Sequence, residues 1–311
     1  MDKQVKYSVI IPVYNGKHSI ADICTRLSKV FEACRNTFEI ILVDDGSKDG
    51  SWQAMKELQR KSPGIKIIQL MKNFGEHNAV MCGLNQSAGE FVVVMDDDGQ
   101  NPPEEIPKLI GKITEGYDVV YGSYRSKKHS LFRNLGSKFN DWFATRLLNK
   151  PQGLYLCSFK IIRKCLVKEI VKYDGPYPYI DGLIFRSTRN IGVVEVAHEE
   201  RRTGRSGYTL VKLIALWSNM FVNFSLLPLR ISTFIGLLFS CVGFLLGVYF
   251  LIDKLLHPEI AIGWASTIVA ILVFAGIQLL MLGMIGEYLG RLLLSSNRTP
   301  QFIVREKCGF G

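Results

Sequence analysis

Three adjacent carboxylates give the first indication of chemistry in this chain. The stretch FVVVMDDDGQNPPEE, residues 91–105, places Asp96, Asp97 and Asp98 directly after an apolar run. That run is typical of a buried strand, because a strand covered on both faces carries continuous rather than alternating apolar residues. Clustered carboxylates at its end repel one another and lose hydration. The arrangement therefore requires a cation, a set of backbone N–H groups, or exposure to water.

The spacing of these polar side chains favours a cation. Asp96 and Asp98 are two residues apart, so they point the same way in an extended chain, and Gln100 continues the series. Two carboxylates and an amide oxygen form a hard oxygen site that suits Mg²⁺ or Mn²⁺. We predict a metal site at these three residues, with Asp97 facing away from it; a plain acidic turn is the alternative. The stretch DGSKDGSWQAMK is not a calcium-binding EF-hand loop, because its twelfth residue is a lysine rather than a glutamate.

The elements that must position these residues form an alternating pattern over the first 122 residues. Short apolar runs alternate with amphipathic stretches such as 19–35 and 51–62, which predicts an α/β fold with a mostly parallel sheet. The polar clusters PVYNG, VDDGSKDGS and MDDDGQNPP follow three of the apolar runs, where a parallel sheet forms its ligand crevice. The expected strands are 7–12, 39–43, 65–70, 91–95 and 119–122.

Two long uncharged segments in the second half predict membrane-spanning helices. Residues 231–252 and 264–286 contain no charged residue, and each is long enough to cross a hydrocarbon core of about 30 Å. Two buried helices of a large soluble domain are the alternative. The residues before the first span are amphipathic and are expected to lie along the membrane surface, with an ordinary packed helix as the alternative. The expected domains are 1–208 (catalytic), 209–230 (amphipathic), 231–252 (span), 253–263 (external loop), 264–286 (span) and 287–311 (tail).

Flanking charge predicts the orientation of the spans. Arginine and lysine residues precede the first span and follow the second, whereas the connecting loop holds one lysine and two acids. The positive-inside rule then places both termini and the catalytic domain in the cytoplasm of an inner-membrane protein. No signal peptide is visible at the start, and the net charge of +10 fits an anionic membrane surface. No nucleic-acid-binding motif is present, and a weak GxxxG pair, Gly243 and Gly247, leaves a homo-oligomer open.

A family resemblance extends over essentially the whole chain. The segments SVIIPVYNG, EIILVDDGSKDGS, NFGEHNAVMCGL, VVVMDDDGQNPPEEIPKLI and YGSYR occur in the order and spacing of glycosyltransferase family 2, which has the GT-A fold. The two spans and GEYLGR make the chain similar to the polyprenyl-phosphate glycosyltransferases, a subgroup that includes dolichyl-phosphate mannose synthase and the bactoprenol glucosyltransferases. The N-terminal motifs specify the superfamily, and the C-terminal features specify the subgroup.

The resemblance implies a role for particular residues. Those that match the nucleotide cradle are Pro12, Tyr14, Asn15, Asp44, Asp45 and Asp96. Those that match the metal and diphosphate site are Asp96, Asp98 and Gln100, and the catalytic group is Asp98, Arg125 and Arg201. Those expected to hold the acceptor phosphate are Arg125, Arg133, Arg201 and Ser206.

The implied reaction is the inverting transfer of one sugar from a nucleotide sugar, with UDP as the expected nucleotide, to undecaprenyl phosphate. The polyprenyl-linked product would serve cell-envelope glycan modification. A metal and arginines would stabilise the leaving diphosphate, and an anionic acceptor phosphate lessens the need for a general base. Some relatives carry an acid in the segment matching YLCSFKII, where this chain offers only Ser158, so no base is assigned. The alternatives are a non-catalytic sugar-nucleotide sensor or scaffold, and a processive polysaccharide synthase, whose QxxRW motif is missing.

Overall fold

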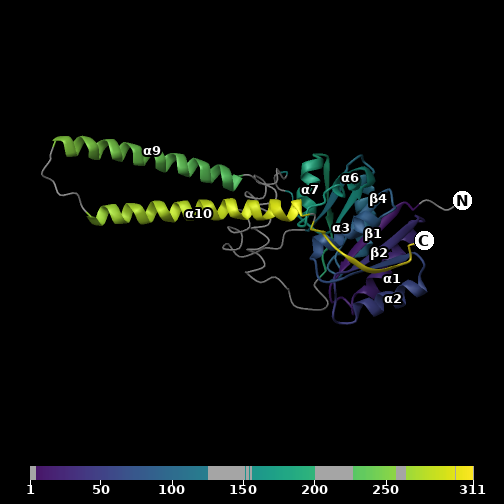
Figure 1. Ribbon diagram of the computed structural model, residues 1–311. Helices are drawn as coiled ribbons and strands as arrows, with labels where there is room; N and C mark the ends of the chain where they lie inside the picture. Colours follow the sequence, from purple (N-terminus) through teal and green to yellow (C-terminus); the bar gives the residue numbers. More distant parts are fainter. Residues whose placement is uncertain are drawn as a thin grey trace. The chain divides into compact units, whose positions relative to one another are not determined.

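The computed structural model describes residues 5–124, 151, 154, 156–199, 227–256, 264–297 and 299–310 (Figure 1). The chain divides into two compact units. The first contains Met1–Thr209 together with Arg298–Gly311, and the second contains Leu210–Asn297. Each unit is a separate structural body and is described by itself.

The first unit is built on an eight-stranded mixed sheet in the order β7-β5-β6-β4-β1-β2-β3-β8. Strand β1 pairs in parallel with β2 and β4, β2 pairs in parallel with β3, and β5 pairs in parallel with β7. Only β6 and β8 run antiparallel to their neighbours, so the predicted mostly parallel sheet is confirmed. The strands are β1 Tyr7–Val13, β2 Phe38–Asp44, β3 Ile65–Leu70, β4 Phe91–Val94, β5 Val119–Tyr124, β6 Lys160–Arg163, β7 Ile191–Val196 and β8 Val304–Cys308.

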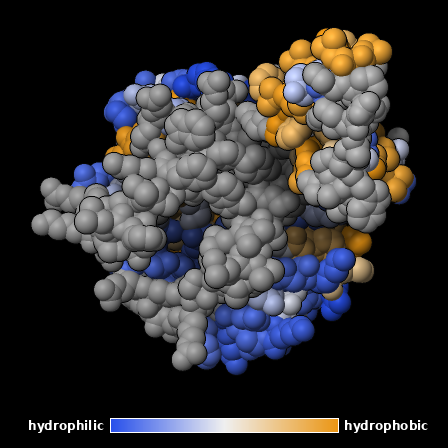
Figure 2. Space-filling model, turned by 90° about the vertical axis from the view of Figure 1, so that its left-hand side faces the viewer, coloured by the Kyte–Doolittle hydropathy of each residue, from blue (hydrophilic) through white to orange (hydrophobic). Residues whose placement is uncertain are grey.

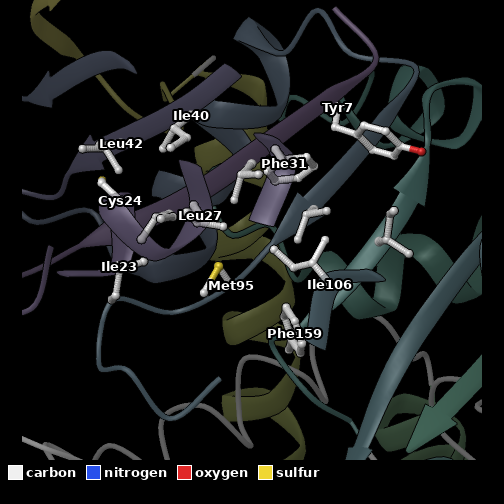
Figure 3. Packing of buried hydrophobic residues seen from close by; sticks show 14 of the residues in the cluster. Tyr7, Ile23, Cys24, Leu27, Phe31, Ile40, Leu42, Met95, Ile106 and Phe159 are labelled. Carbon is white, nitrogen blue, oxygen red and sulfur yellow. The ribbon is translucent and has the colours of Figure 1, made fainter. Parts of the chain in front are cut away.

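Amphipathic helices cover this sheet. In α1, Ile20, Ile23, Leu27 and Phe31 recur at helical spacing and are fully buried, so one face of the helix packs on the strands. Figure 3 shows this face beside β2 side chains such as Ile40 in the hydrophobic core. The helices of this unit are α1 Ile20–Ala33, α2 Ser51–Lys61, α3 Glu76–Gln86, the 3₁₀ turn η1 Pro103–Glu105, α4 Ile106–Ile113, α6 Lys164–Ile170 and α7 Ile180–Ser187.

The loops after β1, β2 and β4 meet at one edge of the sheet. Because these neighbouring strands are parallel, their carboxyl ends lie together. Backbone hydrogen bonds extend the pairing past the strands, from Asp45 N to Val13 O at 2.9 Å and from Met95 N to Ile10 O at 3.2 Å. The polar clusters that the sequence analysis singled out therefore converge.

The residues that follow the second long helix return to the sheet. Strand β8 pairs antiparallel with the edge strand β3, although the sequence analysis predicted no strand there. Two side-chain contacts fix this segment: Lys56 Nζ lies 2.8 Å from Glu306, and Gln301 Nε2 donates to Tyr173 O at 2.6 Å. The covered edge removes a row of unpaired backbone groups from β3.

The second unit contains two long helices, α9 Leu227–Leu256 and α10 Trp264–Ser296. Both are long and apolar enough to cross a membrane, over Ser232–Tyr249 and Val273–Leu294. Their apolar side chains are largely exposed, as at Phe244 and Leu279, and Figure 2 shows such residues gathered in orange. The predicted amphipathic segment lies mostly outside the described residues, and the predicted domain boundaries stay predictions.

Candidate active site

The loops after β1 and β2 are fastened to each other through one asparagine. Asn15 has a positive φ of 57°, a conformation that asparagine tolerates better than most residues. Its backbone N donates to Ser47 Oγ at 2.9 Å, and its Oδ1 accepts from Lys48 N at 2.9 Å. Beside it, Tyr14 is half exposed, whereas Pro12 is buried within β1. Of the predicted nucleotide residues, Tyr14 and Asn15 thus lie in the loop after β1, which is joined to the loop after β2.

The two aspartates after β2 are buried and take most of their hydrogen bonds from the backbone. Asp44 accepts from Ser47 N at 3.0 Å and from Gln69 Nε2 at 3.1 Å. Asp45 accepts from two backbone N–H groups of the β3–α3 loop, at 2.7 and 2.9 Å. Burial nevertheless raises the pKa of Asp45 to about 6, and the nearby Asp44 carboxylate adds to this, while the backbone hydrogen bonds oppose it. These carboxylates shape the loop in which the sequence analysis placed the ribose and base.

Asp96 lies at the end of β4 in an acidic environment. Ser158 Oγ donates to its Oδ2, and Asn101 Nδ2 lies 3.5 Å from the same atom. Burial, together with the carboxylates of Glu76 and Asp98, raises the pKa of Asp96 to about 7, against the Ser158 hydrogen bond. A cation bound here would offset this accumulation of negative charge.

The chain bends directly after Asp96. Gly99 has a φ of +74°, and Gln100 N turns back to donate to Asp98 Oδ1 at 3.0 Å. The expectation that Asp96, Asp98 and Gln100 alternate along an extended chain is therefore wrong in its geometry. The bend arises because glycine adopts this left-handed conformation without strain. The three predicted ligands still belong to one short loop at the carboxyl edge of the sheet.

Asp97 holds the neighbouring loop. Its Oδ2 accepts from Tyr14 N at 3.3 Å, and a Cβ added at Gly16 would lie only 2.3 Å from the same oxygen. Only a glycine leaves room for the carboxylate at this position. Asp97 therefore joins the β4 loop to the β1 loop.

The three predicted metal ligands are of a chemical type that a hard divalent cation binds. Both described partners of Asp96 bind Oδ2, so its Oδ1 has no described protein partner. The set comprises two carboxylates and the amide of Gln100, which are oxygen ligands that Mg²⁺ and Mn²⁺ accept. In the described part of the chain, no group of three or more histidine, cysteine, aspartate and glutamate side chains is arranged to hold a metal ion.

Sequence reasoning missed a group of side chains beside Gln100. His198 follows β7, its ring centroid lies 4.2 Å from that of Tyr124, and its Nε2 lies 3.5 Å from Gln100 Nε2. Tyr124 ends β5, and its hydroxyl donates to Asn101 Oδ1 at 2.5 Å and lies 2.7 Å from Cys157 Sγ. Strands β5 and β7 both end at the carboxyl edge of the sheet. The rule that ligands bind at the carboxyl ends of parallel strands could therefore have identified Tyr124 and His198 once β7 was recognised.

A second missed group is a buried ion pair. Lys160 of β6 pairs with Asp181 of α7, and both side chains are almost fully buried. Tyr121 OH donates to the same carboxylate at 2.8 Å, and Lys160 Nζ lies 4.9 Å from the Tyr121 ring centroid. Lys160 is directly opposite Val94, the last residue of β4, and Asp96 follows Val94 by two residues in the chain. The pair thus lies about one pleat of the sheet away from Asp96.

The remaining predicted residues cannot be placed. Arg125, Arg133, Arg201 and Ser206 lie outside the described residues. Their roles toward the diphosphate and the acceptor phosphate stay predictions.

Comparison with known proteins agrees with this geometry. The model of glycosyl transferase family 2 matches residues 8–170, which is more than half of the chain, and the GtrB C-terminal hairpin matches residues 227–292. The undecaprenyl-phosphate 4-deoxy-4-formamido-L-arabinose transferase of Proteus mirabilis (strain HI4320) is 34% identical over 314 aligned positions, covering 99% of this chain and 95% of the relative. The protein of the same name from Serratia proteamaculans (strain 568) is 34% identical over 308 positions, covering 98% and 94%.

A solved structure supports the fold. Glucosyl-3-phosphoglycerate synthase from Mycobacterium tuberculosis, in complex with UDP, is similar with a TM-score of 0.51 at 19% identity, covering 70% of this chain and 80% of that one. The match extends the agreement from sequence to the arrangement of the sheet and helices. The chain therefore belongs to glycosyltransferase family 2 and is a glycosyltransferase with a GT-A-like catalytic domain.

Proposed function

We propose that this protein transfers a single sugar from a nucleotide-sugar donor to undecaprenyl phosphate at the cytoplasmic face of the membrane. One observation carries the proposal: the similarity spans the catalytic domain and the C-terminal hairpin of relatives that are named undecaprenyl-phosphate sugar transferases. A processive polysaccharide synthase and a non-catalytic sensor are not favoured, because the relatives carry neither name.

The crevice divides into two parts in this proposal. The nucleotide end is the pair of joined loops after β1 and β2, where Pro12, Tyr14, Asn15, Asp44 and Asp45 would hold the base and ribose. The diphosphate end is the bend after β4, where Asp96, Asp98 and Gln100 would hold Mg²⁺ or Mn²⁺. The contact from Asp97 to Tyr14 N fixes the distance between the two ends.

The chemistry requires charge stabilisation rather than a covalent enzyme intermediate. A bound divalent cation would supply Lewis-acid stabilisation of the leaving nucleoside diphosphate. Asp98 and Asp96 would orient the diphosphate by holding its counter-ion, and Asp97 would keep the β1 loop in register with them. Arg125 and Arg201 are proposed to bind phosphate oxygens, with Arg133 and Ser206 on the acceptor phosphate. The anionic acceptor then attacks the anomeric carbon in line, with inversion.

Sheet pairing and charge support the proposed orientation of the domain. Strand β8 follows α10 in the chain and belongs to the same sheet as β1–β4, which precede α9. Both ends of the helical hairpin therefore connect to one domain, which supports placing them on the same side of the membrane. The positive-inside rule favours the cytoplasmic side. A reporter fused after residue 311 should be cytoplasmic, and a periplasmic reporter would contradict the proposed topology.

Direct transfer tests the reaction. Purified protein in detergent would be mixed with undecaprenyl phosphate, Mn²⁺ or Mg²⁺, and a panel of labelled nucleotide sugars, with and without EDTA. The panel should include the formamido-arabinose donor that the relatives' names imply, together with UDP-linked hexoses. We expect one sugar to partition with the lipid only when metal is present. Nucleotide-sugar binding without transfer from any donor would contradict the proposal and favour a sensor.

A further inference from the structure

The residue Glu76 occupies a junction between two parts of the candidate site. The backbone N–H groups of the two residues that precede it bind the Asp45 carboxylate at 2.7 and 2.9 Å. The residue that follows it, His77, packs edge-on against Tyr179 with ring centroids 5.1 Å apart. Tyr179 directly precedes α7. Glu76 is therefore held between the proposed nucleotide end and the beginning of α7, independently of its own side chain.

The cation that influences Glu76 already has a partner. Lys160 lowers the pKa of Glu76 electrostatically, but its Nζ is paired with Asp181. The Tyr121 hydroxyl binds the same Asp181 oxygen, so this group is closed by its own hydrogen bonds. Lys160 is only 3% exposed and Asp181 only 7%. The ammonium cannot leave this pair without leaving a buried carboxylate uncompensated, which is costly.

Glu76 itself is not used to hold the fold. Its carboxylate forms no hydrogen bond or ion pair with the described residues, and part of the side chain reaches solvent although protein surrounds most of the carboxyl group. Desolvation by the surrounding protein raises the pKa of Glu76, and the carboxylates of Asp181, Asp98 and Asp45 raise it further. Of the charged groups that act on this carboxylate, three are acids, and the cation, Lys160, is held by Asp181. Such a carboxylate gains most from a ligand that donates hydrogen bonds.

We propose that Glu76 accepts hydrogen bonds from the donor sugar and helps to determine which sugar is transferred. The inference rests on the proposed function. It gives a binding residue to the sugar of the donor, whereas the residues proposed above bind the nucleotide and the metal. The ligand chemistry is a ring that carries hydroxyl or amide N–H donors on the side facing α7. A site built to bind such a donor rejects analogues that lack it, because its own polar group is then left unpaired.

The test separates the sugar from the nucleotide. Glu76→Gln keeps the size of the side chain but replaces one acceptor oxygen with an N–H donor. We expect kcat/KM for the nucleotide sugar to fall about 10- to 100-fold, the effect of losing a charged hydrogen bond. Inhibition by the free nucleoside diphosphate, which has no sugar, should stay unchanged, as should the KM for undecaprenyl phosphate. Glu169→Gln, at an exposed α6 residue that pairs with Lys172, is the matched control.

A set of deoxy-sugar donors sharpens the result. For a donor that lacks the contacted hydroxyl, wild type and Glu76→Gln should be equally slow, because the interaction is already absent. A loss that is equal for all donors, or that appears in nucleoside diphosphate inhibition or in the lipid KM, would overturn the assignment to the sugar. Wild-type protein that transfers no sugar at all would instead overturn the proposed function. Thermal unfolding of both variants excludes misfolding as the cause.

Discussion

The two ends of the sheet use buried carboxylates in opposite ways. At the amino end, Glu39 is 2% exposed and accepts from Ser8 Oγ at 2.5 Å and from Ala88 N at 2.7 Å. Its other oxygen lies 2.7 Å from Lys66 Nζ. At the carboxyl end, by contrast, acids accumulate around Asp96, and the buried cation that the described residues place there, Lys160, is held by another acid.

The pKa values show what this difference means. Burial would raise the pKa of Glu39, but the hydrogen bonds from Lys66, Ser8 and the Ala88 backbone lower it below its usual value. Burial and neighbouring acids raise the pKa of Asp45 to about 6 and that of Asp96 to about 7. A carboxylate that is paired with its own cation stabilises the fold, whereas hydrogen-bonded carboxylates that have no cation paired with them in the described residues mark the place where a ligand completes the structure.

The largest expected effect tests the carboxyl end. Asp98→Asn should lower transfer by about a hundredfold to a thousandfold, because a metal and diphosphate ligand is lost from the transition state. Asp97→Asn is the matched control and should retain most activity, because the amide oxygen of asparagine can still accept the hydrogen bond from Tyr14 N. Both variants should insert into the membrane like the wild type. Near-normal turnover of Asp98→Asn at saturating metal would contradict the metal-site assignment.

The second prediction tests the amino end. Glu39→Ala removes the acceptor of three groups and leaves the Lys66 ammonium without its partner. We expect it to lower the free energy of unfolding by about 3 kcal/mol. The kinetic constants of the molecules that remain folded should not change, because Glu39 is at the opposite edge of the sheet from the bend after β4. Urea unfolding and donor kinetics measured on one preparation would check both statements. A changed donor KM would show that the two ends are not independent.

The sequence predicted the first half of the fold well for a physical reason. Strands β1–β5 are buried by covering helices, so they carry continuous apolar runs that can be read locally. Strand β6 has only four residues and contains a lysine, and β7 alternates buried and exposed positions. Strand β8 follows a long apolar helix, and its pairing with β3 joins residues more than 230 positions apart. No local pattern encodes that pairing.

The candidate site, like the fold, was predicted where the signal is local in sequence and missed where it depends on distant segments. The spacing of Asp96, Asp98 and Gln100 identified the acidic loop, but the left-handed turn at Gly99 was not foreseen. Their partners come from distant segments, as Ser158 does toward Asp96. The Lys160–Asp181 pair joins β6 to α7, two elements that the sequence analysis did not predict. Residue type and spacing identify the side chains that can take part in chemistry. The groups that bind those side chains or offset their charge are identified only by the tertiary structure.

The smallest expected effect concerns pH, where the two ends should respond with opposite sign. The lowered pKa of Glu39 contributes stability above its unfolded value, and this stability is lost as pH falls through the folded pKa, below about 4.5. The raised pKa of Asp45, about 6 against 3.8, has the reverse effect. The folded state then holds the extra proton between about pH 4 and pH 6, so stability decreases as pH rises across that window.

Two variants isolate these contributions in ligand-free protein. Urea unfolding from about pH 3 to pH 7, followed by pulse proteolysis of the full chain in detergent, gives the slope of stability against pH. Asp45→Asn should remove a decrease of at most about 2 kcal/mol between pH 4 and pH 6. Glu39→Gln should leave the slope between about pH 4.5 and pH 6 unchanged and flatten the profile below about pH 4.5. If Asp45→Asn keeps the wild-type slope, Asp45 is ionised throughout and the carboxyl end is better compensated than its hydrogen bonds indicate. The contrast between the two ends would then depend on the acids around Asp96 alone.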